Sequence, residues 1–163
     1  NPFYREAFFW DRLLAGQPVI VPDDGKRLMQ FIHVDDFARA SILAAESDKA
    51  VGRSYNIAHA SAVSQEELVR TLARVAGITP KLVFVNREVL IARGGQIFEP
   101  PYYFAQYFDM PPVLQDTERA WQELEFKARE FEEGLTDSFL WYRRKGQYAP
   151  PDLSWEKSLL ASL

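Results

Sequence analysis

The sequence predicts an α/β fold in which short strands are flanked by helices. Residues 29–33 alternate apolar and polar side chains, as in a half-buried strand, and from Val34 to Ala45 the apolar residues recur at helical spacing. Two further runs, 19–21 and 81–85, are rich in β-branched and apolar residues and are bounded by proline or asparagine. Strand patterns that alternate with helical patterns are typical of α/β domains.

The other elements are predicted from the same periodicities and from the residues at their ends. Asp35 or Asp36 is the expected N-cap of the helix that begins at Val34, and Ser64 with Glu67 has the spacing of a capping box. We predict helices at 2–14, 64–76, 87–93, 117–124, 131–145 and 154–163, a buried strand at 54–58, and an irregular segment at 96–112. This last segment is rich in aromatic residues and proline, and we expect it to form a lid or pocket wall. For the aromatic residues at 98–108 we favour core and lid packing over stacking on a base or a nicotinamide.

Length and composition predict one domain over residues 1–163, because the chain is 47% hydrophobic and 26% charged. The absence of cysteine excludes disulfides and thiolate metal sites, and the two histidines have no clustered carboxylates around them, so we predict no metal. The net charge of −4 does not favour a broad basic surface for nucleic acid. Neither a membrane span nor a signal peptide is visible, which predicts a cytoplasmic location without a membrane partner.

The junction Phe-Ile-His-Val-Asp-Asp-Phe-Ala-Arg-Ala at residues 31–40 resembles a motif of the extended short-chain dehydrogenase/reductases, the NAD-dependent epimerase/dehydratase family. The resemblance continues through segments 52–58, 64–76, 116–126 and 131–142. It implies that the chain is the C-terminal, substrate-side portion of a longer protein, with the Rossmann cofactor half absent. The chain starts without methionine, which fits that expectation. The parent is then expected to be an NAD-dependent epimerase/dehydratase that uses NAD(P), with the missing N-terminal half as a partner.

The cofactor and catalytic motifs of that family are not found in this sequence. The eight glycines never form Gly-x-Gly-x-x-Gly or Gly-x-x-Gly-x-x-Gly after a strand, so no cofactor-binding residue is assigned. No tyrosine precedes a lysine by four residues, so no catalytic residue is assigned either, and we expect the chain alone not to act as a dehydrogenase. For His33, Asp35 and Asp36 we favour structural roles over acid–base catalysis.

The resemblance also implies where a small-molecule substrate would bind. Members that act on nucleotide-diphosphate sugars carry two arginines that clamp the diphosphate, and the corresponding positions here are Met29 and Gln106. A thioether and an amide cannot replace a bidentate cation, so a typical nucleotide-diphosphate sugar is not expected. Phe31 matches the aromatic position beside the nucleotide, and Asp109 completes the predicted substrate-binding set.

The C-terminal segment has a second resemblance. Phe-Glu-Glu-Gly-Leu-Thr-Asp-Ser-Phe at 131–139 and the residues after it are similar to the ending of the chloroplast stem-loop RNA-binding proteins and their bacterial homologues, which are atypical members of the same superfamily. An RNA-binding protein on the same scaffold is therefore the alternative function, with RNA as the partner. The basic run 143–145 could contact phosphate, although a solvated helix end is the default interpretation. A structural or assembly role and a homodimer also stay open.

Overall fold

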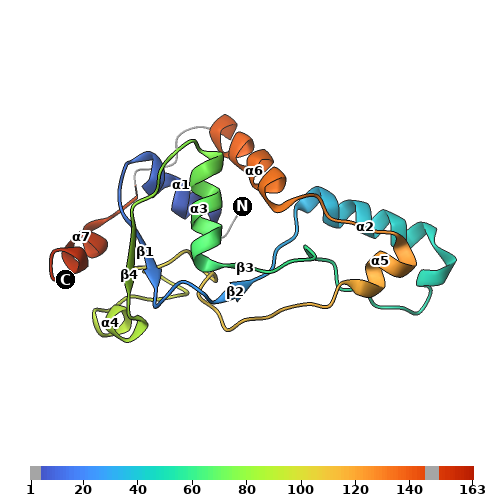
Figure 1. The fold of residues 1–163 in the computed structure, drawn as a ribbon, viewed down its shortest axis with the longest axis horizontal. Coiled ribbons are helices and arrows are strands. Elements are labelled where there is room, and N and C mark those ends of the chain that lie inside the picture. Colours follow the sequence, from blue (N-terminus) through green and yellow to red (C-terminus); the bar gives the residue numbers. More distant parts are fainter. Residues whose placement is uncertain (1–4, 146–150) are drawn as a thin grey trace.

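The computed structural model describes residues 5–145 and 151–163, so part of the predicted helix 2–14 lies outside the described residues. The elements within these ranges are, in order, α1 (Glu6–Leu14), β1 (Val19–Pro22), β2 (Leu28–Met29), α2 (Val34–Glu46), η1 (Asp48–Ala50), β3 (Val63–Ser64), α3 (Gln65–Val75), β4 (Leu82–Val85), α4 (Arg87–Ala92), α5 (Glu118–Leu124), α6 (Phe131–Lys145) and α7 (Ser154–Leu160). The fold is mixed α/β, as predicted (Figure 1).

The strands form two small sheets. β1 and β4 are parallel, with Val19 opposite Leu82 and Pro22 opposite Val85. β2 and β3 are antiparallel, with Met29 opposite Val63. All four residues of β1 are buried, so this strand lies inside the main core, and its parallel pairing with β4 brings the segments after both strands to one edge.

The main hydrophobic core is built from α1, α3, α6, the β1–β4 pair and the segment 103–108. Phe9 of α1 makes edge-on contacts with Phe104 and Phe108, whose ring centroids lie 5.0 and 5.5 Å away. Such edge-on pairs stabilise a core beyond the area they bury. Of the core and lid packing that the sequence favours for residues 98–108, core packing is observed at the centre of the segment, because Tyr103, Phe104, Ala105 and Phe108 are buried in the core.

A second, smaller core joins α2 to α5. Ala40 of α2, Ala120 and Leu124 of α5, and Phe126 are buried together. Figure 1 shows these two helices extending away from α1, α3 and the β1–β4 pair. The chain crosses between the two cores near residues 30–33, 57–63, 112–117 and 125–131 (Figure 1).

The C-terminal helix α7 is anchored to the main core. Glu156 accepts a hydrogen bond from Arg12 Nε at 2.5 Å, and both residues are buried. The Trp155 indole donates to the Arg93 carbonyl at 2.8 Å and covers Gly95. A Cβ at position 95 would lie 2.8 Å from Trp155 Cζ2, so only glycine fits here.

Three local predictions are corrected by the structure. The strand predicted over residues 29–33 forms only as β2 (Leu28–Met29). Helix α2 begins at Val34 as expected, but its N-cap is His33, whose Nδ1 accepts the Asp35 amide at 3.3 Å. The predicted strand at 54–58 is not formed, because no neighbouring strand pairs with it in the described part of the chain. The capping box of Ser64 and Glu67 is confirmed at the start of α3.

Candidate functional site

The structure does not gather the four predicted substrate-binding residues in one pocket. Met29 lies in β2 and is half-buried against the main core. Phe31 packs between Phe131 and Phe108, with ring centroids at 5.6 and 5.7 Å. Gln106 donates to the Phe98 carbonyl at 2.9 Å.

Asp109, the fourth predicted residue, is buried in a polar network. Its side chain accepts two hydrogen bonds from Arg87, one of them at 2.7 Å from Nε to Oδ2, and the Tyr103 hydroxyl donates to Oδ2 at 2.6 Å. Gln65 Nε2 donates to Oδ1 at 2.7 Å, and the side chain of Asp109 has no exposed surface. These partners occupy the carboxylate, so Asp109 fixes the segment after residue 103 rather than facing an open cavity.

The electrostatics of this network follow from its hydrogen bonds. Burial alone would raise the pKa of Asp109, but the hydrogen bonds from Arg87, Tyr103 and Gln65 outweigh burial and hold its pKa below the ordinary value. Burial and the hydrogen bond to Asp109 raise the pKa of the Tyr103 hydroxyl. The pair is therefore ionised aspartate with neutral tyrosine near neutral pH.

The role of Arg87 as the partner of Asp109 is not predicted by the sequence analysis, although the pairing of the two strands that precede Asp23 and Arg87 indicates that these two residues lie close together. Arg87 also donates to Asp23 at 2.5 Å from Nη1, and its backbone amide donates to Asp23 Oδ1 at 2.8 Å. Asp23 follows β1 and Arg87 follows β4. The ends of parallel strands meet at one edge, so a pairing of β1 with β4 would have predicted this contact.

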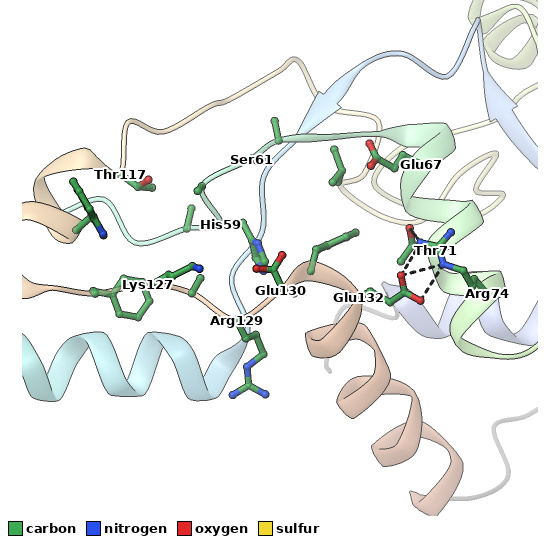
Figure 2. A pocket seen from close by; sticks show the side chains of 18 residues that line it. His59, Ser61, Glu67, Thr71, Arg74, Thr117, Lys127, Arg129, Glu130 and Glu132 are labelled. Atoms are coloured by element: carbon green, nitrogen blue, oxygen red, sulfur yellow. Dashed lines mark hydrogen bonds and ion pairs between the residues drawn. The ribbon is translucent and has the colours of Figure 1, made fainter.

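A cleft of about 550 Å³ lies between the two cores (Figure 2). One wall comes from α3 and the start of α6, the opposite wall from α5 and the residues after it, and the floor from segment 58–63. The floor carries small side chains, which leaves the cleft open. Clefts of this size between packed units are common places for small-molecule binding.

Two charged groups of the cleft, Arg74 and Glu132, bind each other. Arg74 binds Glu132 through Nε at 2.9 and 3.0 Å and through Nη2 at 2.8 Å (Figure 2). The hydrogen bonds between them raise the pKa of Arg74 and lower the pKa of Glu132. Figure 2 shows Arg129 pointing away from the cleft, while His59, Lys127 and Glu130 lie in its middle. Burial lowers the pKa of His59, which favours its neutral form.

Arg129 instead ties α2 to α6. Its backbone amide and Nε donate to Asp36 Oδ2 at 3.0 and 3.2 Å, and Nη1 donates to Asp137 at 2.6 Å. Arg39 binds the other oxygen of Asp36 at 3.1 Å. Burial would raise the pKa of Asp36, but these hydrogen bonds and charges hold it below its ordinary value. Asp36 therefore has the structural role that the sequence favours, but it forms ion pairs with Arg39 and Arg129 and does not cap the helix.

The turns that follow the two parallel strands do not have the form of a dinucleotide site. A dinucleotide needs a glycine-rich turn between a strand and the start of a helix. The turn after β4 holds Asn86 as the N-cap of α4, which has six residues. The turn after β1 holds Gly25, where a Cβ would lie 2.8 Å from Val21 Cγ1, so that glycine serves packing. Over residues 5–145 and 151–163, no three His, Asp or Glu side chains group as metal ligands, and no helix is long and apolar enough to cross a membrane.

Comparison with known proteins extends this description. The sequence profile of the NAD dependent epimerase/dehydratase family matches residues 7–58, from α1 to the crossing between the cores. The chain is 28% identical over 164 residues to the chloroplast stem-loop binding protein of 41 kDa b of Arabidopsis thaliana. The match covers 95% of this chain and 41% of that relative. The predicted resemblance to the NAD-dependent epimerase/dehydratase family is confirmed.

Solved structures show the same fold as this epimerase/dehydratase-like chain. UDP-glucuronic acid 4-epimerase from Bacillus cereus, in complex with UDP-glucuronic acid and NAD, has a TM-score of 0.64 at 17% identity, over 90% of this chain and 41% of that one. MoeE5, in complex with UDP-glucose and NAD, has a TM-score of 0.57 at 28% identity, over 86% of this chain and 41% of that one. The chain therefore spans about two fifths of the length of these relatives.

The similarity to the stem-loop binding protein is broader than the sequence predicted. We expected it in the C-terminal segment, but the match extends over nearly the whole epimerase/dehydratase-like chain. That relative is named as chloroplastic, while the cytoplasmic location of this chain stays a prediction. The same chain thus resembles both the NAD-dependent epimerase/dehydratase family and the stem-loop binding protein.

Proposed function

We propose that the chain is the C-terminal substrate-binding part of an NAD-dependent epimerase/dehydratase-like protein, onto which a cofactor-binding half docks. The observation that carries this proposal is the unpaired backbone of segment 54–58. Its sequence is strand-like, yet none of its backbone amides donates a hydrogen bond within the described part of the chain. Unpaired strand-like backbone is a template for pairing with another strand, so a strand of the cofactor half would complete it.

The exposed face of α2 supports the same proposal. Val34, Phe37 and Ile42 are 72%, 54% and 57% exposed, although they belong to the helix that packs the second core. Large apolar side chains gathered on one exposed helix favour an interface. In this proposal the cofactor half covers these side chains and supplies the NAD(P) site, which the described residues lack.

For the substrate, we propose that Met29, Phe31 and Gln106 border the site, that Asp109 holds segment 103–109 in place behind it, and that the site does not take a typical nucleotide-diphosphate sugar. Met29 carries a neutral thioether, and Gln106 carries a neutral amide that already donates to the Phe98 carbonyl, so neither can clamp a diphosphate. A hydrogen bond to a charged group is worth about 1.5–3 kcal/mol, so two absent arginines cost about a hundredfold or more in affinity.

This substrate proposal is tested by UDP-glucose binding to the full-length parent and to its Met29→Arg variant. We expect weak binding by the unmodified protein and a gain of about tenfold or more in the variant. Leu28→Arg is the matched control, because Leu28 is the neighbouring β2 residue and is more exposed. Tight binding by the unmodified protein would contradict the proposal.

The second candidate function is RNA binding. It is favoured by the 28% identity to the chloroplast stem-loop binding protein over 95% of this chain. Arg143, Arg144 and Lys145 form the exposed last turn of α6, where they could reach phosphates. RNA affinity should then fall steeply with salt, because phosphate neutralisation releases counterions.

A salt titration with a labelled RNA stem-loop tests this candidate. Replacing Arg143, Arg144 and Lys145 with alanine should reduce the slope of log affinity against log salt by about one for each phosphate that is no longer neutralised. Arg53→Ala, an exposed arginine in the turn after η1, serves as the charge control. If the triple variant binds like the unmodified chain, this surface is not an RNA site.

A further inference from the structure

A second, smaller cavity lies beside Phe31 and has a composition that suits a specific ligand chemistry. Its volume is about 250 Å³, and its lining comes from α1, the β2–α2 junction, His59, α3 and α6. One side of the lining is apolar and aromatic, with Phe31, Leu68, Phe131 and Leu135. The volume is below the range for drug-sized ligands and matches a smaller molecule with an apolar body.

Arg5 supplies the positive charge of this cavity. Its guanidinium lies over the Phe108 ring, 5.0 Å from the ring centroid, and its Nε is buried without a hydrogen-bond partner among the described residues. A buried N–H of a cation that lacks an acceptor is costly, so an acceptor from a ligand would stabilise it. The planar fork of arginine matches a carboxylate through two parallel hydrogen bonds.

His33 supplies a second donor on the same lining. Its Nδ1 accepts the Asp35 amide at 3.3 Å, which leaves Nε2 as the ring nitrogen that can donate to a ligand. Gly134 lies against this ring, since a Cβ there would be 3.5 Å from His33 Cδ2. The Gln30 side chain already binds His59 and Gln115, so it does not compete for a ligand.

We propose that this cavity binds the carboxylate of a small ligand with an apolar body, through Arg5 and His33, with Phe31 and Phe131 against the apolar part. The lining carries one guanidinium, that of Arg5, and one acidic side chain, that of Glu6. The single guanidinium can balance a carboxylate monoanion better than a phosphate dianion. The inference deepens the proposed substrate site through Phe31. It does not depend on how a cofactor half docks.

The test uses the 163-residue chain and three probes that share a phenyl ring: benzoate, the neutral isostere benzamide, and phenyl phosphate with its tetrahedral head group. We expect benzoate to shift the NMR resonance of the Arg5 Nε–H group in a saturable way, and benzamide to bind about tenfold or more weakly. Arg5→Gln should weaken benzoate binding by about tenfold or more, while Arg53→Gln should leave it unchanged. Arg53 is exposed and does not line this cavity.

A second variant keeps the proposal testable if Arg5→Gln impairs folding. In Gly134→Ala the added methyl group meets its neighbours at ordinary contact distance and alanine favours the helix, so the fold should persist while the cavity loses room. One extra methyl in a packed pocket should weaken benzoate binding by about tenfold. Equal binding of benzamide, no saturable benzoate shift, or tighter binding of phenyl phosphate would each overturn the carboxylate assignment. Such a result would leave the docking proposal standing, because docking concerns α2 and segment 54–58.

Discussion

At the scale of single residues, the molecule is organised by two buried carboxylates and the arginines that bind them. Asp109 with Arg87 joins segment 103–109 to the edge of the β1–β4 pair, and Asp36 with Arg129 joins α2 to α6. The sequence marked both aspartates as notable but could not name their partners. Those partners lie 22 and 93 residues away along the chain, beyond the reach of local pattern.

We predict that Asp109→Asn destabilises the chain by about 3–5 kcal/mol, because removing one partner leaves the Arg87 cation half-buried without its main acceptor. The measurement is urea unfolding near pH 7. Asp24→Asn, which alters an exposed pair with Lys26, should leave stability unchanged.

The pH dependence of this effect has a defined sign. The folded pKa of Asp109 lies below its ordinary value of 3.8, so its ionised form stabilises the folded state above pH 3.8. That contribution is lost as the pH falls below 3.8 through the folded pKa. The stabilities of Asp109→Asn and the unmodified chain should therefore converge in acid, and a constant gap down to about pH 2 would contradict this account.

At the scale of elements, local chemistry predicted where most helices begin, and tertiary partners decided the strands. Ser64 and Glu67 cap α3 as expected, because both hydrogen bonds of a capping box are made within four residues. Segment 54–58 has a strand-like sequence, yet a strand exists only when a second one pairs with it. The sequence favours core and lid packing for the aromatic residues near Phe104, but it lacks periodicity there, and only the tertiary packing shows which of these residues are core.

We predict that Ser64→Ala costs about 1 kcal/mol, because the Glu67 amide, which donates to Ser64 Oγ at 3.1 Å, loses its acceptor. Thermal unfolding measures the change. Ser41→Ala is the matched control, since the Ser41 hydroxyl donates to a carbonyl of its own helix and does not cap it. A loss in Ser41→Ala as large as that in Ser64→Ala would remove the capping explanation.

At the scale of the whole molecule, the family could be recognised from the sequence because its motifs are local runs, such as residues 31–40 and 131–142. The four predicted substrate residues could be named by position, but their distribution over β2, the junction before α2 and segment 106–109 required the fold. The cavities beside Phe31 and between the two cores could not be predicted, since each is lined by segments far apart in the chain.

The central claim is that segment 54–58 and α2 form the docking surface for a cofactor-binding half. Amide hydrogen exchange measures this most directly, with the buried Val19 amide, which donates to the Lys81 carbonyl at 2.8 Å, as an internal reference. In the isolated chain, the amides of 54–58 should exchange freely, because they have no acceptor in the described residues. In the full-length parent they should slow by about a hundredfold or more. Strong protection in the isolated chain, or free exchange in the parent, would contradict the account.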